Sequence, residues 1–472
     1  MATSELAAAG RRVILLEQEP PTSLGGQAFW SFGGLLLVDS PEQRRLGIRD
    51  SHELALQDWM GSAAFDRPED EWPRRWAEAY VAFAAGEKRV WLHARAVRWF
   101  PAVQWAERGG YLATGHGNSV PRFHVAWGTG PGLIEPFVDD LRSAVAGGRV
   151  SVRFRHRVTG LAVRAGVVEG VTSDVLTTSR LERGTPSRRE VVEAFELVAG
   201  AVVVIAGGIG ANDDLLRRNW PARLGAPPRR MLSGVPDYVD GRMLEVVAEA
   251  GGALVNADRM WSYPEGIRNY APIWSPPGIR ILSGPSPLWL DATGRRLPIP
   301  LFPGFDSLGA LEHITGAGHD HSWFVLNRRI IRLGAEPGPD RAQPSRPVGS
   351  RAARRYHGGR RIRAPGPDFV TAGTAADLAA GMIRVTGERL VDAALLESEI
   401  VARDREIESG FGKDAQVMAI HAARRYRVDR LSGSPSLTGC SIPRPARWSR
   451  SGSGSSPARR WADCSRTCRR AC

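Results

Sequence analysis

The sequence predicts an α/β fold, in which buried strands of a parallel sheet alternate with helices. Arg12 to Leu16 and Val198 to Ala206 are short apolar runs, a pattern typical of strands that are buried on both faces. Leu133 to Val145 carries apolar residues at helical spacing. The length of 472 residues and the hydrophobic content of 43% allow a sizeable core and favour two or three domains over one.

The first predicted strand lies close to the start of the chain. Glu5 to Ala9 is typical of the end of a helix, Gly10 of its C-terminal cap, and Glu17 closes the strand. In a Rossmann unit a glycine-rich turn precedes a helix, and an acidic residue about twenty positions later binds a ribose hydroxyl. Counting back from Glu17, the glycine turn falls at or before Met1. We therefore expect a unit that lacks its first strand and its glycine turn.

The stretch from Trp59 to Trp105 is rich in tryptophan and predicts amphipathic helices. Within it, Trp76, Tyr80 and Phe83 repeat at near-helical spacing. We interpret this stripe as core packing and not as a cofactor-binding box.

The glycine-rich segment Gly128 to Gly132 directly precedes the helix expected from Leu133. A glycine loop before a helix can hold an anion on its free backbone amides. Glycines also simply turn a chain, and the sequence leaves both interpretations open.

Further elements follow from periodicity and from glycine stops. The apolar run that ends at Ala206 enters the turn Gly207-Gly208-Ile209-Gly210, as a buried central strand does. The other expected elements are strands at Val150 to Phe154, Arg157 to Val163 and Gly166 to Val171, and helices at Met243 to Ala250 and Leu390 to Ile407.

The net charge of +13 comes from two segments of the chain. Residues 333–363 hold eight Arg against two acidic residues, and residues 432–472 hold eight Arg against one. These segments account for the whole excess, so the remaining chain has no net charge. Because the chain has only two lysines, we attribute the arginine excess to codon composition and predict no nucleic-acid partner.

The same two segments lack apolar periodicity. The second is an Arg/Ser/Pro/Gly tract that cannot bury enough surface to offset chain entropy, so we predict a disordered tail at 432–472. Between the segments, Phe369 to Tyr426 is orderly again. This alternation indicates, as a hypothesis, a reading-frame shift that is corrected once and then recurs.

Cysteine use and hydropathy give expectations about metal sites and location. All four cysteines lie in the last 33 residues and no histidine follows residue 421, so we predict no metal site. A body without cysteine fits a reducing compartment. No window approaches about eighteen uninterrupted apolar residues, and the start of the chain lacks the pattern of a secretory signal. We predict a cytoplasmic protein that does not insert into a membrane.

The residues from Val13 to Gly34 carry a resemblance to a known family. The run Val-Ile-Leu-Leu-Glu-Gln-Glu, followed by Gly25-Gly26-Gln27-Ala28-Phe29-Trp30-Ser31-Phe32-Gly33-Gly34, resembles the flavoproteins that include fumarate reductases and 3-ketosteroid dehydrogenases. The turn Ala206-Gly207-Gly208 strengthens it. The similarity runs, with interruptions, from about residue 4 to residue 431.

This resemblance implies a Rossmann-like FAD-binding domain with an inserted α+β substrate (capping) domain. It implies an FAD-dependent oxidoreductase that moves hydride between a small organic substrate, steroid-like or dicarboxylate, and the flavin, with an unknown electron acceptor. The expected segments are an FAD-binding domain at 1–235, a substrate domain at 236–332, an irregular basic segment at 333–363, a helical continuation at 364–431 and the tail at 432–472.

The resemblance also implies which residues bind the cofactor. Glu17 is expected to accept ribose hydroxyls, because an acidic side chain at a strand end can make a bidentate contact. Gln27 and Ser31 resemble polar positions around the pyrophosphate and flavin, and the strand near Val158 resembles the one that meets adenine. Glycines that let the backbone approach the cofactor are expected at Gly25, Gly26, Gly33, Gly34, Gly207 and Gly208.

Two residues are predicted to act on the substrate. Thr293 to Pro298 resembles the family's Gly-x-Arg turn, which makes Arg296 the first candidate for orienting a carbonyl or carboxylate. His321 lies in a histidine cluster beside Asp320, with His313 and His319, whose spacing could serve acid–base work or metal binding. Loop histidines without a role are the alternative.

Three hypotheses follow for the whole chain. The first is the FAD-dependent oxidoreductase. The second is an inactive fragment of such a flavoprotein that does not retain FAD, because both the glycine turn and the closing segment of the family are missing. The third, a basic nucleic-acid-binding protein, has no support from the charge of the remaining chain.

Overall fold

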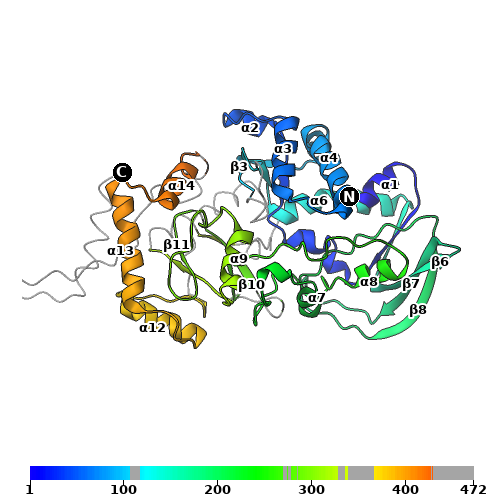
Figure 1. The fold of residues 1–472 in the computed structure, drawn as a ribbon. Helices are drawn as coiled ribbons and strands as arrows, with labels where there is room; N and C mark the ends of the chain where they lie inside the picture. Colours follow the sequence, from blue (N-terminus) through cyan, green and yellow to red (C-terminus); the bar gives the residue numbers. More distant parts are fainter. Residues whose placement is uncertain are drawn as a thin grey trace, which may run out of the picture. The chain divides into compact units, whose positions relative to one another are not determined.

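The computed structural model describes residues 1–106, 117–268, 274, 278–283, 285–327, 335–337, 366–426 and 428 (Figure 1). The chain divides into one compact unit at Met1–Cys440 and a second at Ser441–Cys472, and the second lies outside the described residues. The predicted disordered tail, and the basic segment apart from 335–337, are therefore outside the description as well.

A parallel pair of strands opens the fold. β1 (Val13–Glu17) runs beside β5 (Val150–Phe154), and each residue of β1 faces one residue of β5 in the same order. Both strands are confirmed: an apolar run predicted β1, and an alternating pattern predicted β5. Glu17 is the last residue of β1, as expected.

Two helices cover this parallel pair. α1 (Ala2–Ala8) leads into β1 and α6 (Thr129–Ala146) leads into β5. Ala7, Leu141 and Val150 are buried together where the helices meet the strands. The helix end predicted before Gly10 and the helix predicted from Leu133 are both confirmed.

A three-stranded antiparallel sheet follows directly in the chain. Its strand order is β6-β7-β8, and α8 contacts β6 (Figure 1). The linker at 177–190 joins β7 to β8. The bounds are β6 (His156–Arg164), β7 (Val167–Leu176), β8 (Val191–Val198) and α8 (Arg242–Glu249).

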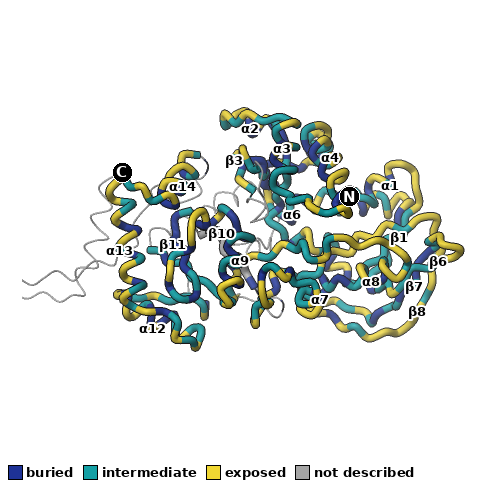
Figure 2. Tube along the Cα trace, in the orientation of Figure 1, coloured by how far each residue is buried: buried dark blue, intermediate teal, exposed yellow. Residues whose placement is uncertain are grey.

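The prediction of a buried central strand at Val198 to Ala206 is wrong. Strand β8 ends at Val198, and the residues up to Ala206 form no strand. Val203 is 59% exposed and Ile205 is 66% exposed. Among the described residues β1 pairs only with β5, so no neighbouring strand covers this apolar run. Figure 2 shows that the preceding strand, β8, is also largely exposed.

A second antiparallel sheet, of strand order β2-β4-β3, lies among four helices. Its core contains Leu37, Leu92, Val97 and Phe137. The bounds are β2 (Gly34–Leu36), β3 (Trp99–Gln104), β4 (Phe123–Ala126), α2 (Pro41–Arg45), α3 (His52–Ala63), α4 (Glu71–Ala85) and α5 (Lys88–Ala94).

The tryptophan stripe on α4 packs differently from the prediction. Trp76 is 74% exposed, whereas Ala77, Val81 and Ala84 form the buried side of the helix. The other two members of the stripe are partly buried. The helix buries its small residues, so Trp76 is not part of the core.

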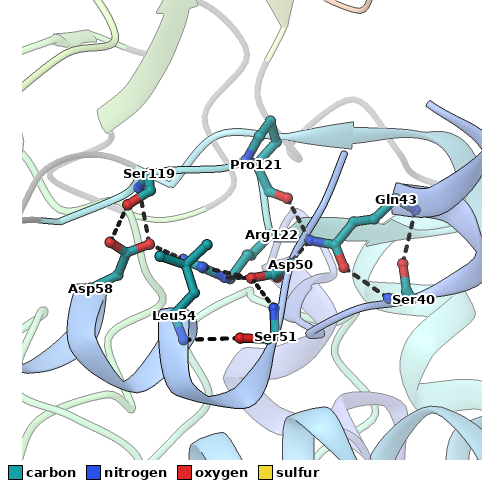
Figure 3. A network of polar contacts seen from close by, with 9 residues as sticks. All are labelled: Ser40, Gln43, Asp50, Ser51, Leu54, Asp58, Ser119, Pro121 and Arg122. Carbon is teal, nitrogen blue, oxygen red and sulfur yellow. Dashed lines mark hydrogen bonds and ion pairs between the residues drawn. The ribbon is translucent and has the colours of Figure 1, made fainter. Parts of the chain in front are cut away.

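A buried polar network fixes this helical region onto strand β4 (Figure 3). The Arg122 guanidinium donates to Asp50 at 2.7 Å and to Asp58 at 2.5 Å, and all three side chains are almost fully buried. Gln43 donates to Asp50 at 2.8 Å, and Ser40 caps α2 by accepting from the backbone of Gln43. The network therefore joins the loop before α3 to the helices α2 and α3 and to Arg122, the residue directly before β4.

Most of the later described residues form an antiparallel pair of strands and four helices, and two of these helices, α12 and α13, share one core with the strands. Leu288, Leu290, Val325, Met382 and Leu396 are buried there. Thr374, Asp392 and Asp414 each accept a hydrogen bond at the start of a helix. The bounds are β11 (Leu288–Leu290), β12 (Trp323–Val325), α9 (Ser307–Gly316), α12 (Ala375–Thr386), α13 (Ala393–Ser409) and α14 (Ala415–Ala423).

Short elements complete the description. They are α7 (Asp213–Arg218), β9 (Gly266–Arg268), β10 (Gly278–Ser283), β13 (Ala335–Pro337) and the 3₁₀ turns η1 (Pro21–Ser23), η2 (Gly26–Trp30), η3 (Pro68–Asp70) and η4 (Ala222–Leu224). None of the helices in the described ranges has the length and apolar character needed to cross a bilayer.

Candidate functional site

The site predicted for the cofactor begins at the carboxyl end of β1. Ligands of α/β folds bind outside the carboxyl ends of parallel strands. The Glu17 carboxylate stands there, partly exposed, and accepts a hydrogen bond from the backbone N–H of Glu19 at 2.9 Å. Burial raises the pKa of Glu17, and this hydrogen bond opposes the rise. The carboxylate is held in place with capacity for further hydrogen bonds.

The loop that carries the first glycine pair follows β1. Gly25 and Gly26 both have left-handed backbones, with φ of 107° and 55°. A β-carbon at Gly25 would lie 2.7 Å from Ile134 of α6, so only glycine lets the loop lie against this helix. The space beside Gly26 is open. A ligand can therefore approach the backbone at Gly26.

The second glycine pair, Gly33 and Gly34, is packed closely against other residues, and neither position has room for a β-carbon. At Gly33 this atom would clash with the backbone of Thr129, and at Gly34 it would overlap the ring of Phe123. Both glycines therefore have a packing reason that does not involve a cofactor. Their predicted role in cofactor binding stays a prediction.

The glycine segment before α6 packs against the same loop. The N–H of Gly130 donates to the carbonyl of Ser31 at 3.0 Å, and a β-carbon at Gly130 would lie 2.5 Å from the carbonyl oxygens of Ala28 and Phe29. Carbonyl oxygens repel an anion. The described contacts support the turn-and-packing interpretation of this segment over the anion-binding one.

Ser31 and Gln27 have different surroundings. The Ser31 hydroxyl donates to the carbonyl of Ala28 at 2.7 Å and accepts the N–H of Gly33 at 3.2 Å, so it stabilises the loop. Gln27 Oε1 would lie 3.4 Å from a β-carbon at Gly207. The structure thus brings together the Gly25–Gly34 loop and the distant turn at Gly207 and Gly208.

A group of aromatic residues, missed by the sequence reasoning, lies beside this convergence. Trp30 Nε1 donates to the Tyr238 hydroxyl at 3.3 Å, and Trp30 packs edge-on against Trp274 with ring centroids 5.1 Å apart. Gln18 reaches the backbone carbonyl of Tyr238 at 3.3 Å. Burial raises the pKa of Tyr238 to about 12. No local pattern in the sequence links these residues, because they are more than 200 positions apart.

Val158 lies on β6, where it pairs with Ser173 of β7 and is partly buried. Strand β6 contacts β1, which places Val158 on a neighbouring element of the site.

The two residues predicted to act on the substrate lie in separate polar clusters. Arg296 forms an ion pair of 2.6 Å with Asp414 at the start of α14. His321 Nδ1 is 3.0 Å from Asp320, whose second oxygen is 3.3 Å from Arg229. Burial acts to raise the pKa of Asp320, but the contacts with His321 and Arg229 lower it overall.

The sequence offered two candidate groups of metal ligands, the cysteines and the histidine cluster, and we predicted no metal site. All four cysteines lie outside the described residues. In the described ranges, no three His, Cys, Asp or Glu side chains are arranged to hold a metal ion.

Sequence comparison identifies relatives of this chain. Residues 1–451 match the FAD binding domain family. KsdD-like steroid dehydrogenases of Mycobacterium tuberculosis are 55% identical over 447 residues, which is 91% of this chain and 77% of theirs. The KsdD-like steroid dehydrogenase of Mycolicibacterium smegmatis is 54% identical over 448 residues, 92% of this chain and 80% of its own.

Two solved structures share the fold. The 3-ketosteroid-Δ4-(5α)-dehydrogenase of Rhodococcus jostii, solved with 4-androstene-3,17-dione, aligns with a TM-score of 0.53 and 18% identity, covering 88% of this chain and 76% of its own. A flavocytochrome c3 fumarate reductase aligns with a TM-score of 0.51 and 16% identity, covering 88% and 65%.

These matches confirm the predicted fold, the FAD cofactor and the oxidoreductase class, and they favour the enzyme over the inactive fragment. The chain belongs to the FAD binding domain family of flavoprotein oxidoreductases.

Proposed function

We propose that this FAD-dependent oxidoreductase is a dehydrogenase of steroid-like ketones. One observation supports the proposal above the others. The end of β1, the glycine loop and the Gly207 turn converge in a chain that is 55% identical to proteins named steroid dehydrogenases over 91% of its length.

We assign the cofactor to the residues around this convergence. Bound FAD supplies the redox chemistry by exchanging a hydride with the substrate. Glu17 accepts ribose hydroxyls, and the open backbone at Gly26 and Gly208 admits the cofactor. The other proposed cofactor-binding residues are Gly25, Gln27, Ser31, Gly33, Gly34, Val158 and Gly207.

The surroundings of Arg296 favour a steroid over a dicarboxylate. A dicarboxylate needs a guanidinium that is available for a bidentate contact. Asp414 already neutralises Arg296 at 2.6 Å, and both side chains are largely buried. A substrate carboxylate would have to displace Asp414. An uncharged ketone needs only one hydrogen bond, which the paired guanidinium can still donate.

We assign proton transfer to His321. Asp320 holds the Nδ1 side of the ring, as a carboxylate does when it orients a catalytic imidazole. Nε2 has no recorded protein partner in the described residues, and 21% of the side chain is exposed. The ring is therefore oriented and accessible on one side.

Anaerobic reduction of the purified flavoprotein tests the function. We expect saturated 3-ketosteroids to bleach the visible flavin absorption and succinate to leave it unchanged. Bleaching by succinate alone, or by neither class of compound, would contradict the proposal. Purified protein that contains no flavin and binds none would also contradict it.

Substitution of His321 tests the proton-transfer role. Loss of an acid–base group slows a reaction about 10²–10⁴-fold, so His321→Asn should slow steroid-dependent flavin reduction by that order while flavin content is unchanged. The neighbouring His319→Asn serves as the matched control. Equal rates in both variants would exclude His321 from proton transfer.

A further inference from the structure

The linker between β7 and β8 is fastened to the residues that follow β1. Thr22 donates to the carbonyl of Leu181 at 2.7 Å, and Ser187 donates to the Glu19 carboxylate at 3.0 Å. Arg155 donates to Ser187 at 2.8 Å. Glu19, Arg155 and Ser187 are all buried. The linker is therefore held against the edge of the proposed cofactor site.

This attachment places Arg183 against the glycine loop. Arg183 Nη2 donates to the carbonyl of Leu24 at 3.0 Å, and the guanidinium carbon lies 3.8 Å from the ring centre of Phe29. A β-carbon at Gly25 would lie 4.0 Å from Arg183 Nη1. Stacking and one hydrogen bond thus fix the plane of the guanidinium.

The other end of the Arg183 guanidinium has no partner. Nη1 is buried and makes no hydrogen bond with any described residue. Burial lowers the pKa of Arg183, and only the Tyr238 hydroxyl opposes this effect. The nearby Arg189 differs, because it forms an ion pair with Glu19. The side chain as a whole is partly buried, but a buried N–H of a cation without an acceptor is unfavourable, and a bound anionic group removes this penalty.

We propose that Arg183 binds the pyrophosphate of FAD and holds the cofactor from the linker side. The inference rests on the proposed placement of FAD at the end of β1. A pyrophosphate brings the negative charge and the acceptor oxygens that the partly buried guanidinium lacks. Arginine is suited to phosphate oxygens because its planar N–H groups match their geometry. Leu24 and Phe29 hold the group beside the loop, with Nη1 left to donate.

Titration of flavin-free protein with FAD tests the inference. Charge-assisted contacts to phosphate are strong, so we expect Arg183→Met to weaken FAD binding about 10–100-fold. Arg183→Lys keeps the charge and should lose less. ADP, which carries the pyrophosphate, should compete with FAD for the wild-type protein and compete more weakly for Arg183→Met. The control is Arg142→Met, since Arg142 is 71% exposed on α6 and pairs with Asp139.

Salt dependence and thermal unfolding separate binding from a structural role. A phosphate contact makes affinity fall with salt, so Arg183→Met should show a shallower dependence on salt than wild type. Wild-type protein that binds FAD, with Arg183→Met equal to it at every salt concentration, would overturn the inference. Weaker binding with an unchanged salt slope and a lower unfolding temperature of the flavin-free variant would assign Arg183 to loop packing and overturn it as well. Wild-type protein that binds no FAD contradicts the proposed function itself.

Discussion

At the scale of single residues, Gly34 lets strand β2 lie against an aromatic ring. A β-carbon at this position would overlap the ring of Phe123 on the neighbouring strand β4. Overpacking of a fixed interior costs about 1–3 kcal/mol. We expect Gly34→Ala to lower the free energy of unfolding by that amount, measured by chemical denaturation.

Gly316 provides the control for this substitution. It ends α9, and no atom lies within 4 Å of the position that a β-carbon would take. Gly316→Ala should leave stability unchanged or raise it slightly, because alanine restricts the unfolded chain. A loss of equal size in both variants would show that the contact with Phe123 is not the cause.

Lys88 gives stability a specific dependence on pH. Its ammonium lies 4.0 Å from the ring centre of Tyr80 and donates to the carbonyl of Leu36, and burial lowers its pKa to about 8. The unfolded pKa of lysine is about 10.4. Between these values the unfolded chain holds a proton that the folded chain has released. Raising the pH through this window therefore stabilises the fold.

Comparison with Lys88→Met isolates this effect. The stability of wild type relative to the variant should rise by about 3 kcal/mol between pH 7.5 and pH 10.5. The difference between the two proteins cancels the titration of the tyrosines that do not touch Lys88, and Tyr80→Phe in both proteins removes the one that does. A flat difference across the window would show that the amine is not desolvated.

At the scale of elements, the Arg122 network fastens α3 to strand β4. Asp50 is fully buried and Asp58 is 3% exposed, so removing the guanidinium leaves two buried carboxylates unpaired. Breaking such a group costs about 3–5 kcal/mol. We expect Arg122→Leu to lower the free energy of unfolding by that amount, and Asp50→Asn with Asp58→Asn in the same chain to restore part of it.

An exposed ion pair serves as the control. Arg44 and Asp39 are 64% and 39% exposed, so Arg44→Leu should leave the free energy of unfolding nearly unchanged. If both arginine variants lost the same stability, burial of the network would not explain its contribution.

The elements also show what the sequence could predict. β1, β5 and α6 follow from local apolar patterns, and each was confirmed. The run from Val198 to Ala206 has the same local pattern, yet a strand needs a partner, and periodicity does not reveal whether one is present. The prediction that Trp76 packs in the core was wrong for a similar reason, because helical spacing does not identify which side of α4 meets the core.

The candidate site was predictable to the same extent. The chemistry of Glu17 and the glycine loop could be predicted from their place after an apolar strand. Tyr238 and Arg183 could not, because they reach the loop through contacts that span about 160 to 210 positions in the chain. Such contacts leave no periodic signal.

At the scale of the whole molecule, two predicted segments share one core. Residues of 288–325 and of 379–400 are buried together, so the helical continuation packs on strands assigned to the substrate domain. The expected location in the cytoplasm, the absence of a nucleic-acid partner and the reading-frame hypothesis stay predictions from composition.

The exposed apolar run before Gly207 also affects how the protein behaves at high concentration. Val203 and Ile205 are uncovered and follow β8, which is an edge strand of its sheet among the described residues. Exposed apolar side chains beside an edge strand favour contact between molecules, which lowers colloidal stability. We expect light scattering to rise steeply with protein concentration, and Val203→Lys with Ile205→Lys to suppress the rise. The control is Arg142→Glu at an exposed position of α6, which changes the net charge by two, in the opposite direction, without removing an apolar side chain. The exposed apolar residues before Gly207 would then limit the concentration at which the protein stays in solution.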